Sequence, residues 1–205
     1  MNEAFLARVR AAVRAQPVTV HAVPSHAVVR RVAVEARGLA ELFAKNATAV
    51  GMRVTRVSDA DLNATLLRLL EPHGATVVAV RDPDLAARAA KSAGSRLVAN
   101  DNADALFDCI VGITDVECAI AESGSIVVST TGRIRNAWIT PPIHIAIVRE
   151  SQILADLVDL FESRPDALDA ASTTIITGPS KTADIEGVLV TGVHGPAAVE
   201  IVLLA

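Results

Sequence analysis

The sequence has 205 residues, and its 19 lysines and arginines against 23 aspartates and glutamates give a formal net charge of −4. Hydrophobic residues make up 51% of it, enough apolar surface to offset the entropy that the chain loses on folding. Only 2% of the residues are aromatic, and the sequence has no basic block. It therefore predicts a folded protein and disfavours nucleic-acid partners, which need stacking side chains or a basic stripe.

The sequence has two cysteines, Cys109 and Cys118, in an apolar region. They match no metal-ligand spacing, and we expect both to be buried structural thiols. Because an iron–sulfur cluster normally takes four thiolates, no such cluster is expected on this chain. The histidines His21, His26 and His73 show no partner at ligand spacing, so no metal site is expected either.

The N-terminal residues mix charges into their first turns and lack the apolar core of a secretory signal. A cytoplasmic location is the resulting expectation. The most apolar stretch, residues 109–130, is interrupted by Asp115, Glu117 and Glu122, so no membrane span is expected there.

The first part of the chain has helical periodicity. Apolar residues recur at helical spacing over residues 3–15, which predicts a short amphipathic helix. Pro17 and Pro24 then indicate an extended or looping stretch. Helical spacing returns from about residue 25 to Val50, and Gly51 supplies the stop.

From residue 52 onward, β-branched runs alternate with helical segments. The expected strands are 52–57, 76–80, 96–99, 108–113, 125–130, 144–149, 172–177 and 197–204. The expected helical segments are 59–72, 82–93, 115–120, 151–163 and 182–190. This alternation predicts one α/β domain with a mostly parallel sheet flanked by helices, spanning residues 31–205 behind an N-terminal helical and extended segment, residues 1–30.

Three loops of the second half have the composition of a ligand site: residues 121–125, 130–136 and 177–184. In α/β proteins, ligands bind outside the carboxyl ends of strands, where free backbone N–H groups favour anions. The sequence therefore predicts a small-anion pocket. The candidate ligand-binding residues are Ser123, Gly124, Ser125, Arg133, Arg135, His144, Gly178, Ser180, Lys181, Thr182, Asp184 and Gly195.

Two residues are candidates for catalysis. Glu122 lies beside a glycine turn, where a carboxylate can act as a nucleophile or base, or can anchor the backbone of the turn. His194 lies between glycines, which leaves its ring accessible to move a proton or donate to an anion. Arg133 and Arg135 alternate along their segment, so at most one of them is expected to face a pocket.

Residues 118–148 and 175–204 contain a set of motifs: AESGS at 121–125, Arg135 before PPIH at 141–144, and GPSKTADIE at 178–186 before HGP at 194–196. With this set the chain resembles the lactate-utilisation (LUD) domain family, in particular its stand-alone lactate utilisation protein C subfamily. The resemblance implies a fold like that of the CoA-transferase and ribose-5-phosphate isomerase group.

The resemblance also implies a function. It makes the chain a cluster-free subunit that acts with iron–sulfur partner proteins in oxidising L-lactate to pyruvate. Two alternatives remain open. One is an independent CoA-transferase-like or sugar-phosphate isomerase-like enzyme that uses Glu122, because Glu122-Ser123-Gly124 is similar to the Glu-x-Gly turn of CoA transferases. The other is a binding module that senses an anionic metabolite.

Overall fold

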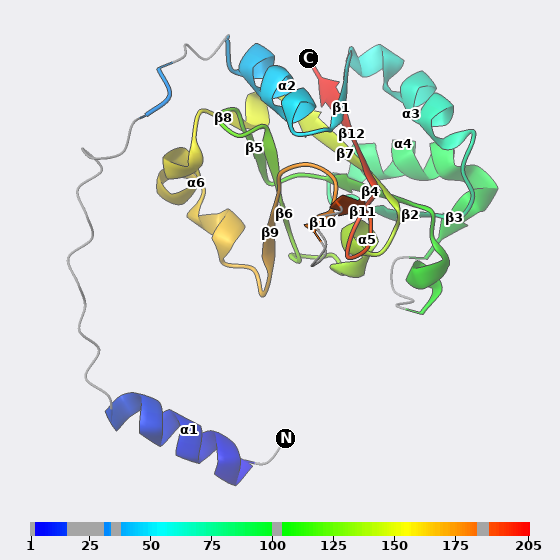
Figure 1. Cartoon of the computed structure of the whole chain (residues 1–205). Coiled ribbons are helices and arrows are strands. Elements are labelled where there is room, and N and C mark those ends of the chain that lie inside the picture. Colours follow the sequence, from blue (N-terminus) through cyan, green and yellow to red (C-terminus); the bar gives the residue numbers. More distant parts are fainter. Residues whose placement is uncertain (1–2, 16–30, 34–37, 100–103, 184–188) are drawn as a thin grey trace. The chain divides into compact units, whose positions relative to one another are not determined.

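The computed structural model describes residues 3–15, 31–33, 38–99, 104–183 and 189–205 (Figure 1). The chain divides into two compact units, Met1–Arg30 and Arg31–Ala205. The described part of the first unit is helix α1 (Glu3–Ala15), which has the predicted bounds and an ion pair between Arg10 and Glu3 at 3.3 Å.

The second unit is built on a six-stranded sheet with the order β1-β12-β7-β4-β2-β3, in which every neighbouring pair is parallel. Its strands are β1 (Arg53–Val57), β2 (Thr76–Ala79), β3 (Leu97–Val98), β4 (Val111–Asp115), β7 (Ile143–Arg149) and β12 (Ala198–Leu204). The register places His144 of β7 between Gly112 of β4 and Val199 of β12. This main sheet confirms the predicted parallel α/β fold.

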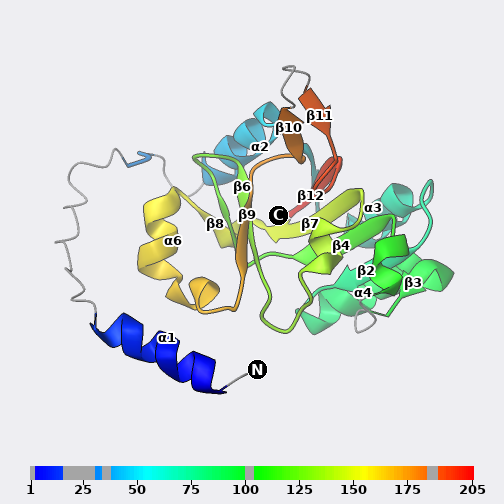
Figure 2. The same ribbon diagram turned by 60° about the horizontal axis from the view of Figure 1, so that its bottom comes forward.

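A second, mixed sheet has the order β8-β5-β6-β9, and β10 and β11 form an antiparallel pair of their own (Figure 2). The strands are β5 (Cys118–Ile120), β6 (Ser125–Ser129), β8 (Ile153–Leu154), β9 (Thr173–Ile176), β10 (Lys181–Ala183) and β11 (Leu189–Thr191). Only β5 and β8 run parallel in the mixed sheet. The chain leaves the mixed sheet at β9 and re-enters the main sheet at β12.

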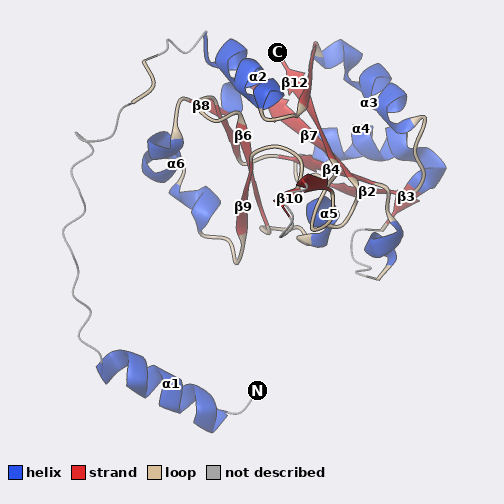
Figure 3. Cartoon of the chain, in the orientation of Figure 1, coloured by secondary structure: helices blue, strands red, loops and turns tan. Residues whose placement is uncertain are grey.

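Helices separate and cover these sheets (Figure 3). The α-helices described in the second unit are α2 (Leu39–Ala49), α3 (Leu62–Leu70), α4 (Pro83–Ala93), α5 (Asn136–Ile139) and α6 (Leu157–Ser163). The described 3-10 turns are Asp59–Asp61, Gly94–Arg96, Ala105–Asp108, Glu150–Gln152 and Pro165–Leu168. Leucines of α3 and α4 pack on one face of the main sheet. On the other face, α2 and α5 share a core with one face of the mixed sheet, and α6 packs on the far side of that sheet.

Local signals placed several of these boundaries correctly. The side chain of Asp82 accepts hydrogen bonds from the backbone N–H groups of Asp84 at 3.0 Å and Leu85 at 3.1 Å, so it caps α4 as its position before Pro83 predicts. Gly94, with φ of 57°, ends that helix, and Gly51, with φ of 95°, follows α2.

The long helix predicted over residues 25–50 is wrong over its described first part. Residues 31–33 are not helical, and α2 begins only at Leu39. Asp156 holds this segment instead, because it accepts hydrogen bonds from Arg31 Nε at 2.7 Å and from the Val32 backbone at 3.2 Å. A contact between residues so distant in sequence leaves no local periodic signal.

Three more helix predictions need correction. Residues 115–120 form the end of β4 and then β5, because Glu117 N–H donates to Val127 of the neighbouring strand at 2.8 Å. Residues 181–183 and 189–191 are strands rather than one helix. In the segment 151–163 the helix begins only at Leu157, after Asp156 has capped it.

Candidate functional site

A pocket that gathers four of the predicted site residues lies between β9, α5 and the start of β12. We call it the β9–β12 pocket. It has a volume of about 270 Å³, and its lining includes Trp138, Thr174, Thr177, Gly178, Ser180, His194, Gly195 and Val199. Four of these residues, Gly178, Ser180, His194 and Gly195, are predicted site residues, so the structure brings the loop 177–184 together with the His-Gly-Pro turn.

The pocket is not at the predicted edge of the main sheet. Val199 is the second residue of β12 and Ile139 precedes β7, so the pocket lies at the amino ends of these parallel strands. The loop 177–184 does follow a strand, but that strand, β9, belongs to the mixed sheet. The strand-end rule concerns a single parallel sheet, whereas this loop follows a strand of the mixed sheet.

Backbone hydrogen bonds fix the pocket's polar wall. Ser180 N–H donates to Pro196 at 2.8 Å, and Gly192 N–H donates to Ser180 at 2.9 Å, so the loop after β9 is tied to the turn before β12. Gly178, with φ of 98°, lies so close to the end of α2 that an added Cβ would be 2.5 Å from the Val50 carbonyl oxygen. Glycine is therefore required at this position, because it lets the backbone of the loop pack directly against the end of α2.

The polar groups of the lining are mainly hydroxyl groups. Thr174, Thr177 and Ser180 contribute hydroxyl groups, and the exposed His194 contributes an imidazole. Trp138 is fully buried, and its Nε1 has no hydrogen-bond partner among the described residues. No lysine or arginine lines the described pocket. It can hold a small carboxylate or a polar molecule through hydroxyl and imidazole groups.

Hydroxyl groups connect this pocket to the first predicted loop. Ser125 Oγ lies 2.7 Å from Ser123 Oγ and 2.7 Å from Thr177 Oγ1. Because Ser125 is buried and Thr177 lines the pocket, this chain of hydrogen bonds joins the AESGS turn to the pocket wall. Two of the three predicted loops are thereby neighbours.

Helix α2 anchors the AESGS turn. Asn46 Nδ2 donates to the carbonyl oxygens of Ala121 at 2.8 Å and Glu122 at 2.9 Å. Gly124, with φ of 67°, packs so closely that an added Cβ would be 2.1 Å from the Ala47 backbone nitrogen. The Glu122 side chain is exposed and makes no hydrogen bond or ion pair with described residues. Its carboxylate is therefore not what anchors the turn, and it remains available to solvent.

Arg133 is buried and serves as the counter-charge of two carboxylates. Its guanidinium donates to Glu117 Oε1 at 2.8 Å, to the Asp115 carboxylate and to the Asp115 carbonyl oxygen at 2.9 Å. It also lies 5.9 Å from the centre of the Trp138 ring. Burial lowers the pKa of Arg133, and the two carboxylates oppose that shift. The side chain of Arg135, in contrast, is exposed and has no partner among the described residues.

The carboxyl edge of the main sheet is occupied by these charges. Glu117 also accepts hydrogen bonds from Arg81 and from Ser129 Oγ, both at 2.6 Å. Beyond them, Arg149 at the end of β7 pairs with Asp82 after β2 at 3.3 Å. Among the described residues the charges at this edge pair with one another, so the edge offers little unpaired charge to a ligand.

His144 points into the core and is not in the pocket lining. Its Nε2 lies 2.9 Å from Thr114 Oγ1, and its Nδ1 has no described partner. Burial, reinforced by the charge of Arg133, lowers the pKa of His144 to about 3. The ring is therefore neutral at physiological pH, and the contact with Thr114 orients it.

The rest of the third loop lies outside the pocket. Lys181 and Thr182 belong to β10, where they pair with Thr191 and Val190 and not with a helix N-terminus. Asp184 lies outside the described residues. The helix predicted to begin at residue 182, whose N-terminus would favour an anion, is thus not formed at residues 182–183, because they belong to a strand.

Reasoning from the sequence missed Trp138 and Asn46. Trp138 is the sequence's single tryptophan and lies between two of the motifs, which is a signal that was available. Asn46 gave none, because its partners are more than seventy residues away. Both cysteines are buried, as predicted, and burial raises the pKa of Cys118 to about 11. Within the described residues, no cluster of metal-ligating side chains forms and no helix has the length and apolarity to cross a membrane.

Comparisons with known proteins agree with this fold and these motifs. A solved structure of a DUF162 family protein from Deinococcus radiodurans matches with a TM-score of 0.67 and 19% identity, covering 84% of this chain and 99% of that one. At this identity the likeness concerns the fold. Lactate utilization protein C of an Exiguobacterium species is 32% identical over 180 residues, covering 81% of this chain and 77% of that protein.

Lactate utilization protein C of Bacillus subtilis is 37% identical over 101 residues, which covers 46% of this chain and 42% of that protein. The LUD domain family model matches residues 40–204, which include both sheets and all three predicted loops. The chain therefore belongs to the LUD domain family.

Proposed function

We propose that this chain acts in lactate utilisation, as a subunit that carries no iron–sulfur cluster and works with cluster-carrying partner proteins in oxidising L-lactate to pyruvate. The observation that carries the proposal is the 32% identity, over most of both chains, to the Exiguobacterium protein named for lactate utilization. The match extends well beyond one motif, which favours a shared role over a shared fold alone.

The positions of the two cysteines support the proposal that this subunit carries no cluster. Cys109 packs in the core between the two sheets, whereas Cys118 packs on the opposite face of the mixed sheet, under α6. Thiolates are the ligands of iron–sulfur clusters, and burial raises the pKa of both thiols. Two separated, protonated thiols are poor cluster ligands, so the proposal assigns electron transfer to the partners.

The proposal gives the β9–β12 pocket to a small carboxylate. Its volume of about 270 Å³ suits a molecule of a few heavy atoms. The Ser180 and Thr177 hydroxyl groups and the His194 imidazole are the groups that would donate to the carboxylate oxygens. Ile139, Val199 and the Trp138 ring would contact an apolar end such as the methyl group of lactate. This assignment depends on the pocket's chemistry and is tested separately from the cellular role.

The cellular role is tested by deleting the gene and growing cells with L-lactate or pyruvate as sole carbon source. We expect growth on L-lactate to be lost and growth on pyruvate to be kept, because the lesion precedes pyruvate. A tagged chain is expected to co-purify with proteins that show iron–sulfur absorbance. Normal growth on L-lactate in a strain without another lactate dehydrogenase would contradict the proposal.

The pocket is tested by titrating the purified chain with L-lactate and pyruvate, followed by NMR chemical shifts. We expect Ser180→Ala and His194→Gln to weaken binding about tenfold each, which is the effect of losing one hydrogen bond to a charged group. Lys45→Gln is the control, since Lys45 is exposed on α2 and does not line the pocket. Equal affinity in all three variants would remove the ligand from this pocket without touching the cellular role.

A further inference from the structure

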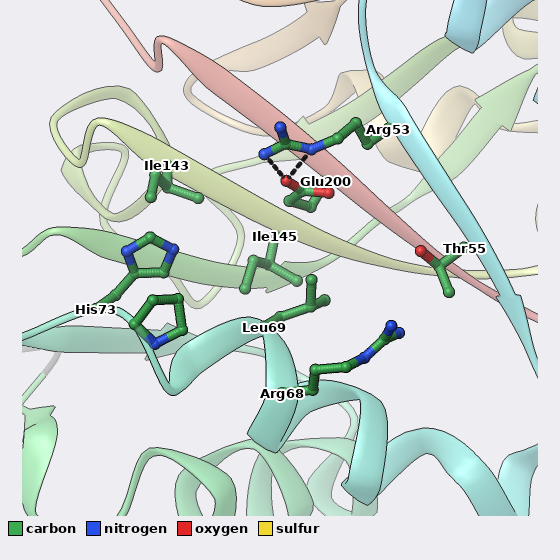
Figure 4. Close-up of a pocket in the computed structure, with 9 residues that line it drawn as sticks. Arg53, Thr55, Arg68, Leu69, His73, Ile143, Ile145 and Glu200 are labelled. Atoms are coloured by element: carbon green, nitrogen blue, oxygen red, sulfur yellow. Dashed lines mark hydrogen bonds and ion pairs between the residues drawn. The ribbon is translucent and has the colours of Figure 1, made fainter.

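A second cavity lies on the opposite face of the main sheet, beside α3. We call it the α3 cavity. It has a volume of about 330 Å³, and its polar lining consists of Arg53, Thr55, Arg68, His73 and Glu200 (Figure 4). Ile143, Ile145 and Leu69 form its apolar floor. Of the sequence motifs only PPIH contributes to it, through Ile143, and its size is within the range of small-molecule sites.

Glu200 is out of place for a structural residue. It lies in β12, a central strand with the sequence AVEIVLL, and its side chain is only 9% exposed. The next residues on the same face, Val202 and Leu204, are packed in the core under α3 and α4. A carboxylate at such a position is costly to desolvate, so packing alone gives no reason for it.

Arg53 only partly compensates this carboxylate. Its guanidinium contacts one oxygen, Oε1, through both Nε and Nη2, and these contacts raise the pKa of Arg53. The Arg53 side chain is 70% exposed, and ion pairs with exposed partners contribute little to stability. The other oxygen, Oε2, has no partner among the described residues and is not among the fully enclosed unpaired atoms. It is therefore open to accept a hydrogen bond in the cavity.

Two further basic side chains border the cavity with no described partner. Arg68 is on the last turn of α3 and His73 follows that helix, and Figure 4 shows both on the α3 side of the apolar floor, across from Arg53 and Glu200. The cavity thus offers the Arg68 guanidinium and the His73 imidazole, both without a described partner, on one side and a carboxylate oxygen on the other. A ligand that satisfies both has a negative group and a hydroxyl group within a few bonds of each other.

We infer that the α3 cavity is a binding site for a small anion that carries a hydroxyl group, with Arg68 holding the anionic group and Glu200 Oε2 accepting the hydroxyl hydrogen. The anionic group is a carboxylate or a phosphate, because Arg68 suits either. The inference uses the geometry of this cavity alone, and it stands whether or not the chain acts in lactate utilisation.

The test uses two pairs of probes, titrated into the purified full chain by calorimetry, and the members of each pair differ only by two hydroxyl groups. Glycerate is compared with propionate, and glycerol 3-phosphate with propyl phosphate. We expect the hydroxylated member of one pair to bind at least tenfold more tightly than its partner. The pair that does so identifies the anionic group. No saturable binding of any probe at millimolar concentration would overturn the inference.

Variants locate the binding. Arg68→Gln removes an exposed charge without disturbing the core, and we expect it to weaken the bound probe at least tenfold. Arg8→Gln, at an exposed arginine of α1, is expected to leave the affinity unchanged. Glu200→Leu removes the acceptor oxygen and should abolish the preference for the hydroxylated probe. Affinity that survives Arg68→Gln, or falls equally with Arg8→Gln, would place the ligand elsewhere and contradict the inference.

Discussion

The guanidinium of Arg133 and the carboxylate of Glu117 are joined at 2.8 Å with both side chains almost completely buried. Arg133 follows β6 of the mixed sheet, and Glu117 lies in the short link between β4 of the main sheet and β5 of the mixed sheet. Asp115, at the end of β4, is the second carboxylate that Arg133 contacts. This ion-pair cluster therefore fixes the junction at which the chain passes from one sheet to the other.

Replacing Arg133 with methionine is expected to destabilise the fold by about 3–5 kcal/mol, because it removes the buried counter-charge that Asp115 and Glu117 share. Arg135→Met is the matched control, two residues along the same segment but exposed, and it should cost less than about 0.5 kcal/mol. Urea unfolding followed by circular dichroism measures both. Equal stability of the two variants would show that the buried pair does not hold the junction.

Gly124→Ala is expected to be far more destabilising than Gly132→Ala. Both glycines have φ of 67°, so the conformational strain of alanine, on the order of 1–2 kcal/mol, is common to the two variants. An added Cβ at Gly124 meets the backbone of α2 at 2.1 Å, whereas nothing lies within 4 Å at Gly132. The difference in melting temperature isolates the packing of the AESGS turn on α2. Equal losses would mean that this contact is relaxed in solution.

Glu122→Gln is expected to leave the free energy of unfolding unchanged within about 0.5 kcal/mol, because the carboxylate is exposed and has no described partner. Any loss of function in this variant would then report chemistry and not unfolding. Full complementation of a deletion strain on L-lactate would end the catalytic hypothesis for Glu122. Asn46→Ala is the counterpart, because it removes the turn's two anchoring bonds and should lower stability by about 1–3 kcal/mol.

We expect the burial of His144 to lower the free energy of unfolding at mildly acidic pH. Its pKa is about 3 in the folded state against 6.5 for the ordinary imidazole, so between these values the unfolded state binds the proton and the folded state does not. Above pH 6.5 the effect vanishes. At pH 5 it lowers the free energy of unfolding by about 2 kcal/mol.

The measurement compares unfolding free energies at pH 7 and pH 5 for the parent and for His144→Gln. The variant should lose less stability over this interval, by about the stated amount, whatever its stability at pH 7. A His144→Gln variant with the parent's pH dependence would contradict the burial of a neutral ring.

The sequence by itself determined the elements whose signals are local. The Asp82-Pro83 start of α4, the Gly94 stop and the β-branched strands β2, β7 and β12 follow from residues that contact their own neighbours in sequence. The motifs also sufficed to identify the family, because they preserve residue types and spacing. The motifs also mark four candidate site residues that line one pocket: Gly178, Ser180, His194 and Gly195.

Only the tertiary structure decided which face of the protein each polar residue occupies. Residues 181–183 and 189–191 became a strand pair, and residues 118–120 became a strand, because neighbouring strands supply their hydrogen bonds. Arg133 and Arg135 differ by two positions in sequence, yet two carboxylates draw the first into the core and leave the second in solvent. Glu200 is one carboxylate in an apolar strand, and only the placement of α3 opens a cavity beside it. Burial and pairing depend on contacts between distant segments, and these contacts exist only once the two sheets have formed.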